Sequence, residues 1–143
     1  MERMISEVAI AYYDYPLLAG QVIERGHIVA VDSTGSVVRA TGAAGQLPIG
    51  IAMNTVVAAD GVKPVTVKFW REIWAAWWDN DSAAPITIAK LWQAAYVKDS
   101  HTVTLTGASG AFALGAIVNV DANQGVLVHS DYPFQKPVAA AEI

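Results

Sequence analysis

Hydrophobic positions in this chain come in short runs that alternate or are rich in β-branched residues, separated by turns rich in Gly, Asp and Ser. The first run, residues 22–31, is interrupted at Gly26 and predicts a strand, a kink and a second strand. Residues 32–36 predict a turn into a returning strand that starts at residue 37. Residues 49–57 predict a largely apolar strand. Because no long helical period is evident, the pattern indicates an all-β fold with short strands and frequent turns.

The segment 62–74 has the most regular alternation of the chain. Its apolar positions are Val65, Val67, Phe69 and Ile73, and the opposite face holds Thr66, Lys68, Trp70, Glu72 and Trp74. Trp70, Trp74 and Trp78 are also spaced four residues apart, which would suit a helix. We favour a strand to about Trp74, because Val-Thr-Val leads into this segment without a helix cap or breaker.

The second half of the chain repeats a signature of the first. Thr41-Gly42-Ala43 recurs 65 residues later as Thr106-Gly107-Ala108; Gly45, Ile49-Gly50 and Asn54 recur at the same offset as Gly110, Leu114-Gly115 and Asn119. Flanking matches slip by one or two residues, which loops tolerate and strands do not. Two copies are too few for a solenoid. We therefore expect two related β units that close one core, the alternative being coincidence in an Ala- and Gly-rich chain.

The repeat also sets the expected domain boundaries. A single β domain, a small barrel or sandwich, is expected over residues 20–129, with repeat units of about 65 residues at 20–75 and 85–129. Residues 1–19 are expected to form an extended N-terminal arm and residues 130–143 a C-terminal tail. Six glycines at equivalent points are expected to be structural, two of them (Gly50 and Gly115) at close backbone approaches within strands: Gly42, Gly45, Gly50, Gly107, Gly110 and Gly115.

Aromatic residues crowd into two places, the arm and the segment after residue 69. They are Tyr12, Tyr13 and Tyr15 in the first and Trp70, Trp74, Trp77 and Trp78 in the second. The arm tyrosines should dock on the chain's own core or on a neighbouring subunit. Four tryptophans this close should not all fit one small β core, so we expect them, with the tyrosines, at an oligomer or partner interface. Core packing and a carbohydrate-stacking platform are the alternatives for the tryptophans.

Charged residues make up 15% of the chain, against about 25% in typical soluble proteins. Such a surface predicts an obligate oligomer, because another chain must cover what charges do not. A net charge of -4 with scattered basic residues disfavours nucleic-acid binding. The absence of Cys excludes disulfides and thiolate metal sites. No apolar stretch approaches the ~20 residues of a membrane span, and the first residues lack the pattern of a signal peptide.

Motifs that would carry chemistry are weak. His27, His101 and His129 lie in separate segments without metal-ligand spacing. The glycine clusters lack the Lys-Ser/Thr of a phosphate loop. The segment 79–81 starts like a calcium loop, but Ala84 stands where that loop needs Gly and Lys90 where it needs Glu, so we expect a solvated turn. Without a nucleophile elbow or a paired-carboxylate arrangement, we expect no enzyme, cofactor or metal.

Two sets of matched segments resemble one known family. They are residues 26–32 (GHIVAVD), 48–52 (PIGIA) and 65–67 (VTV) in the first copy, and residues 93–99 (QAAYVKD) and 113–118 (ALGAIV) in the second. This order of strand, turn, returning strand and Ile-Gly step resembles the capsid decoration (cement) proteins of tailed bacteriophages. The match covers residues 20–129; the Trp-rich segment 70–78 and the aromatic arm depart from it.

The resemblance implies a compact β-barrel or sandwich, usually trimeric, on the outer surface of a phage capsid. Such a protein is made in the host cytoplasm and binds the major capsid protein where its subunits meet, and it stabilises the shell against internal DNA pressure. It would bind neither nucleic acid nor membrane. A head-fibre or tail module that binds host glycans through its tryptophans is the alternative function, and a small intracellular β-barrel enzyme is a third.

Overall fold

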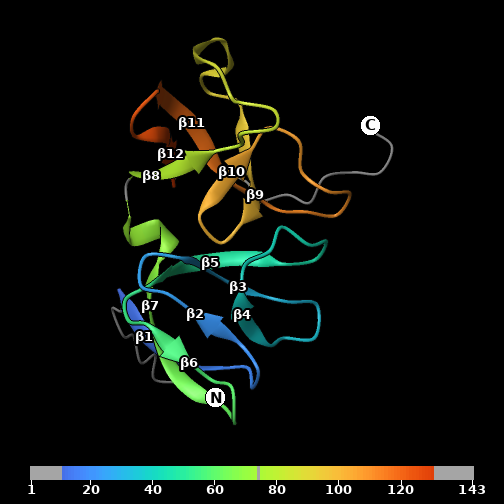
Figure 1. Cartoon of the computed structure of the whole chain (residues 1–143), viewed down its shortest axis with the longest axis vertical. Coiled ribbons are helices and arrows are strands. Elements are labelled where there is room, and N and C mark those ends of the chain that lie inside the picture. The colour runs from blue at the N-terminus through green and yellow to red at the C-terminus, as the bar shows by residue number, and fades with distance from the viewer. Residues whose placement is uncertain (1–10, 74, 131–143) are drawn as a thin grey trace, which may run out of the picture.

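The computed structural model describes residues 11–73 and 75–130, and it confirms the all-β prediction. Two small β-barrels are stacked along the long axis of the molecule (Figure 1). Between them the described chain makes a single turn of 3-10 helix, η1 (Trp70–Glu72); a second such turn, η2 (Ile88–Lys90), lies within the second barrel's sequence. The residues expected to build one core therefore build two closed sheets.

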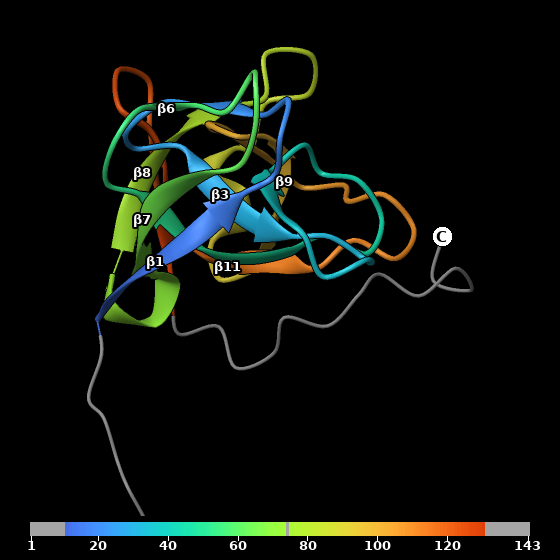
Figure 2. The same ribbon diagram turned by 90° about the horizontal axis from the view of Figure 1, so that it is seen from below.

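The first barrel has five strands in the closed order β1-β4-β3-β5-β7. Their bounds are β1 (Tyr12–Leu17), β3 (Ile28–Val31), β4 (Val37–Arg39), β5 (Leu47–Ala52) and β7 (Lys63–Phe69). Figure 2 looks up at this barrel and shows β1 crossing its near side beside its antiparallel partner β7. A parallel pairing of β1 with β4, Leu17 opposite Val37, closes the ring. A short antiparallel ribbon of β2 (Val22–Ile23) and β6 (Val56–Val57) adds Ile23 and Val56 to the core of this barrel.

The second barrel has the same connectivity, in the closed order β10-β8-β12-β11-β9. Its strands are β8 (Ala75–Asn80), β9 (Ala94–Asp99), β10 (Thr102–Thr104), β11 (Ala113–Asp121) and β12 (Gly125–His129). The strand β8 takes the place of β1, and its parallel pairing with β10, Asp79 opposite Thr102, closes this ring as β1 and β4 close the first. The sequence repeat is therefore a repeat of a whole five-stranded barrel.

Each barrel begins earlier in the chain than the sequence indicated. The strand β1 lies in the segment assigned to the arm, and β8 starts at the last residue of the expected first unit and continues into the stretch between the two expected units. The strand predicted over residues 62–74 ends at Phe69, and neither it nor a helix continues through Trp78. The sequence repeat does not extend to the first strands, because a Tyr-rich and a Trp-rich segment have no residue pattern in common. Residues 1–10 and 131–143 of the expected arm and tail lie outside the described residues.

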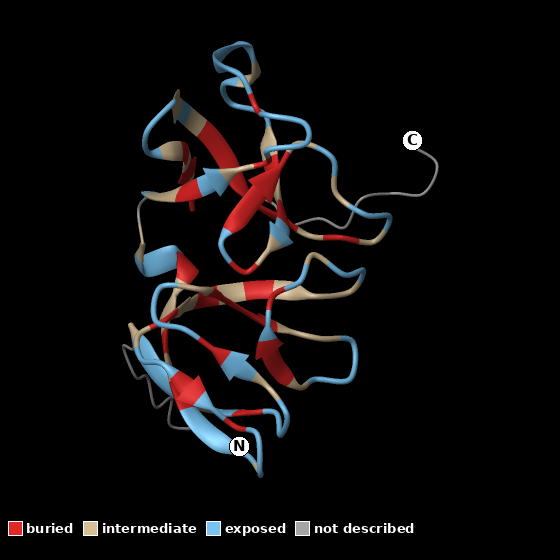
Figure 3. Ribbon diagram, in the orientation of Figure 1, coloured by how far each residue is buried: buried red, intermediate tan, exposed pale blue. Residues whose placement is uncertain are grey.

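Two hydrophobic cores are formed, one inside the first barrel and one that spans both barrels (Figure 3). The strand β3 explains the division: Val29 points into the first barrel, whereas Ile28 and Ala30 point outward and are still buried. These outward residues belong to the same cluster as Val97 and Leu114 of the second barrel. Burial on both faces of a strand requires cover on the outside, and the second barrel supplies it.

Gly50 of β5 and Gly115 of β11 occupy matching positions. A Cβ on Gly50 would overlap the carbonyl oxygen of Lys68, and a Cβ on Gly115 would overlap that of His129. Both sites are close backbone approaches, as the sequence predicted. The other expected structural glycines serve the turns and the seam: Gly42, Gly45 and Gly110 have positive φ, and Gly107 packs against the Tyr96 ring.

We expect Gly50→Ala and Gly115→Ala to destabilise the protein by similar amounts of about 1–3 kcal/mol, because a methyl group at either site meets backbone that cannot move aside. The control is Gly35→Ala, which has positive φ but no neighbouring atom, so that it measures backbone strain of about 1 kcal/mol alone. Urea unfolding followed by circular dichroism gives all three values. A large loss at one site and none at the other would contradict the equivalence of the barrels.

Candidate functional site: the aromatic face and the inter-barrel groove

Trp70 joins the two barrels. It is 3% exposed, and its indole N–H donates a hydrogen bond to the carbonyl oxygen of Leu114 across the seam, at 2.6 Å. Its ring also contacts that of Trp78, with centroids 5.9 Å apart and planes tilted by 51°. A buried indole needs a partner for its N–H, and here the partner belongs to the other barrel. The residue therefore fixes the end of β7 against β11.

The interface prediction for the tryptophans is wrong for Trp70 and Trp78, which are core residues at 3% and 5% exposure. The prediction assumed one small core, but the second barrel and the seam provide room for both rings. Trp77 is half-buried on β8, and Trp74 lies outside the described residues. Trp92, which the sequence analysis left out of the candidate set, is 65% exposed.

Tyr13 and Tyr15 form the beginning of an aromatic face on the first barrel. Tyr12 and Tyr13 are 49% and 51% exposed, and Lys68 lies over the Tyr12 ring at 5.7 Å. The Tyr13 and Tyr15 ring centroids are 5.0 Å apart, and Tyr15 is 6.4 Å from Phe69. These side chains stand on β1 and β7, so they belong to a rigid sheet rather than to a loose arm. Tyr13, Tyr15 and Phe69 share one side of the sheet, and we call them the aromatic face. Tyr12 lies next to Tyr13 in the strand and points to the opposite side, with Lys68.

The aromatic face leads into a groove of about 580 Å³ between the barrels. Tyr15, Phe69 and Trp70 line it from the first barrel and the linker, together with residues 47–49 of β5. Phe112 and Ser130 line it from the second barrel, and Arg71 and Glu72 add charge. The volume falls in the range of small-ligand and peptide-anchor sites. The sequence placed Tyr15 and Trp70 in one candidate set, and the groove brings them together.

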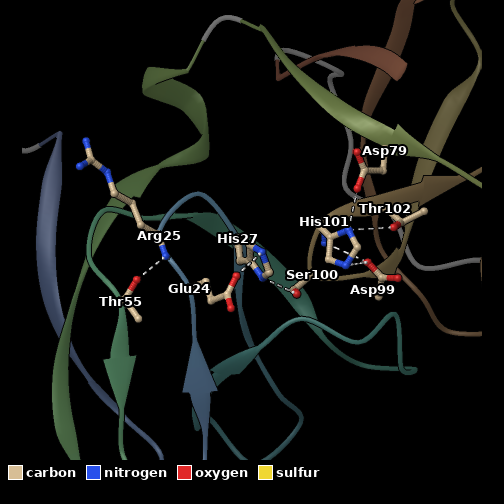
Figure 4. Close-up of polar contacts among 9 residues, drawn as sticks. All are labelled: Glu24, Arg25, His27, Thr55, Asp79, Asp99, Ser100, His101 and Thr102. Carbon is tan, nitrogen blue, oxygen red and sulfur yellow. Dashed lines mark hydrogen bonds and ion pairs between the residues drawn. The ribbon is translucent and has the colours of Figure 1, made fainter. Parts of the chain in front are cut away.

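A second polar site crosses the seam at two of the three histidines (Figure 4). His27 Nδ1 is 2.8 Å from the Ser100 hydroxyl, and the rings of His27 and His101 are 5.2 Å apart. The backbone N–H of Ile28 donates to the carbonyl oxygen of Ser100 at 2.8 Å. Sequence spacing gave no sign of this cluster, because the two histidines are 74 residues apart and only the stacking of the barrels joins them.

Carboxylates flank both histidines. Glu24 lies 3.5 Å from His27 Nε2, and His101 contacts Asp79 at 2.8 Å and Asp99 at 3.4 Å. Glu24, His27 and Ser100 form a chain of acid, imidazole and hydroxyl, but Ser100 is only 5% exposed, which leaves no space for a substrate at its oxygen. The arrangement serves to connect the barrels. Within residues 11–73 and 75–130, no group of three or more His, Cys, Asp or Glu side chains could hold a metal ion.

The acidic segment 79–81 is not the solvated turn that the sequence suggested. Asp81 is 5% exposed and accepts hydrogen bonds from Lys98 Nζ, from the Thr104 hydroxyl at 3.0 Å and from the Ala83 backbone N–H at 3.0 Å. The hydrogen bond from Lys98 is the largest cause that lowers the pKa of Asp81 to about 2; burial opposes it, and the bond from Thr104 lowers the pKa further. The carboxylate ties the loop after β8 to β9 and β10, so its role is structural.

A scan against protein-family models, a search of curated proteins and a search of solved structures each found no match to this chain. Across the described ranges, no helix has the length and apolar character needed to cross a membrane. The class of molecule that the geometry defines is a tandem β-barrel with an aromatic face and an inter-barrel groove lined by aromatic and charged residues.

We expect Trp70→Phe to lower the free energy of unfolding by about 1–3 kcal/mol more than Trp78→Phe does. Both changes shrink a buried ring, but only Trp70 loses a hydrogen bond, since Trp78 Nε1 has no partner among the described residues. Guanidinium unfolding of the two variants provides the comparison. Equal losses would mean that the bond to Leu114 does not hold the barrels together.

The stabilisation that Asp81 provides should depend on pH. Its folded pKa is depressed, so its contribution is complete above the unfolded value of about 4 and is lost as the pH falls from there through about 2. The difference in urea midpoint between wild type and Asp81→Asn should therefore be largest above pH ~4 and shrink towards pH ~2. Asp60→Asn, in an exposed turn, is the control. A difference that stays constant over this pH range would contradict the ion pair with Lys98.

Proposed function

We propose that this protein is a capsid decoration protein that binds the outer surface of a bacteriophage shell and stabilises it. The observation that carries the proposal is the aromatic face: partly exposed tyrosines held on a closed barrel beside the inter-barrel groove. The resemblance of residues 20–129 to decoration proteins points the same way. The proposed partner is the major capsid protein, at the places where its subunits meet.

The aromatic face suits a protein partner. Tyr13 and Tyr15 offer large, rigid contact area at small entropic cost, and aromatic side chains contribute much of the energy of protein interfaces. The barrel holds these residues in place before binding, which lowers the cost of association.

Shell stabilisation then results from mass action. A protein that binds only the assembled shell lowers the free energy of that state, by RT ln(1 + [L]/Kd) for each site. Assembly as a homotrimer, which the low charge and the resemblance both favour, would present three aromatic faces at once and raise the avidity of each shell contact.

Glycan binding is the second candidate, and Trp92 is the specific observation that favours it. Its indole is 65% exposed, whereas Trp70 and Trp78 are buried. An exposed indole is a suitable platform for a sugar ring. This alternative places the binding site on the second barrel, away from the tyrosines of β1.

The test is co-sedimentation with empty, expanded shells of the phage that encodes the protein, using the Tyr13→Ser variant. Each aromatic contact at the centre of an interface contributes about 2 kcal/mol or more, so affinity should fall at least about thirtyfold. The control is Val62→Ser, which changes a residue that is 59% exposed outside the aromatic face.

Sedimentation velocity of the free protein shows whether it is a trimer. A glycan array that compares wild type with Trp92→Ser shows whether Trp92 binds glycans. If the wild-type protein does not bind shells but binds glycans, and Trp92→Ser abolishes the glycan binding, the second candidate function replaces the proposal. Shell binding that survives Tyr13→Ser would move the binding site away from the aromatic face.

A further inference from the structure

The groove lies where equivalent residues of the two barrels meet. Leu47 and Phe112, 65 residues apart, are repeat counterparts, and both line it. Phe69 and Ser130 are counterparts as well, because they come directly after Lys68 and His129, whose carbonyl oxygens sit against Gly50 and Gly115. Nearby, the backbone N–H of Gly45 donates to its own counterpart, Gly110, at 3.0 Å. Contacts between equivalent residues are what an approximate twofold rotation produces.

The two barrels differ at the next position along the chain. After Phe69 the chain enters the seam as Trp70, whose indole reaches the carbonyl oxygen of Leu114 in β11. The counterpart of Leu114 is Ile49 in β5, and Ile49 lines the groove. The indole of Trp70 therefore fills the space beside Leu114 of the second barrel. The equivalent space beside Ile49 of the first barrel is the groove.

We infer that the groove is the docking site of the chain's own C-terminal segment, with Tyr132-Pro133-Phe134 as the anchor. Ser130, the last described residue, is 8% exposed and lines the groove, so the chain leaves the described structure from inside it. Four further residues span up to about 13 Å, so Tyr132 and Phe134 have the groove within reach. The inference does not depend on the proposed shell binding.

The chemistry of the segment matches the groove. Two aromatic rings flank a proline, which restricts the preceding residue to an extended conformation and limits the entropy lost on docking. The groove presents Tyr15, Phe69 and Phe112 to such rings. Arg71 at the groove makes no ion pair with a described residue. Asp131 follows Ser130 in the sequence, so a docked segment would offer this guanidinium a carboxylate.

The test uses the full chain, which has no native Cys. Glu72→Cys, at an exposed position of the groove, is combined with Gln135→Cys, which leaves both aromatic residues of the segment intact. The matched control carries the same two cysteines together with Tyr132→Ser and Phe134→Ser. Docking should make the intrachain disulfide form at least about tenfold faster in the first protein than in the control, because it raises the effective concentration of the two thiols.

Non-reducing gels and far-UV circular dichroism monitor both proteins. The inference is overturned by equal rates in the two proteins, since a free tether would bring the thiols together without the aromatic residues. Disulfide-linked dimers would also overturn it, because they place a second copy's segment in the groove. If the first cysteine pair perturbs folding, Arg71→Cys with Lys136→Cys repeats the comparison from the neighbouring positions.

Discussion

The apolar seam between the barrels is the contact on which the rest of the structure depends. The outward residues Ile28 and Ala30 of β3 are as deeply buried as residues inside the barrel, and this is possible only because the second barrel covers them. At about 25 cal/mol per Å² of apolar surface, a barrel that exposed this face to water would lose much of the energy that holds a small domain together. The two barrels therefore stabilise each other.

Polar contacts determine the relative position of the two barrels across the seam. A hydrophobic contact alone tolerates sliding, whereas the bond from Trp70 to Leu114 and the contact of His27 with Ser100 each require one relative position of the barrels. The close approach of Gly42 to the Val97 carbonyl demands the same position, since no Cβ fits there. The low content of charged residues has a partial explanation within a single chain. Surface that would face water if the barrels were separate is buried between them.

The same junction determines where binding can occur. By fixing the end of β7 against β11, it places Phe69 and Tyr15 at the edge of the groove, and Tyr13 on the paired strand β1 continues the aromatic surface from there. The aromatic face and the groove are consecutive parts of one surface. A partner bound to the face and a segment docked in the groove would rest on the same rigid strands.

The sequence by itself determined the fold class, the duplication and the role of its in-strand glycines. Alternation, turn residues and backbone sterics are local properties, so Gly50 and Gly115 could be matched from their neighbours alone. It could not place Trp70 and Trp78, because an alternating pattern shows which face a residue occupies but not whether another barrel covers that face. Nor could it find β1, which has no residue pattern in common with β8, or the contact between His27 and His101. Only the tertiary structure decided these, because closing a barrel and stacking two of them are contacts between residues far apart in the chain.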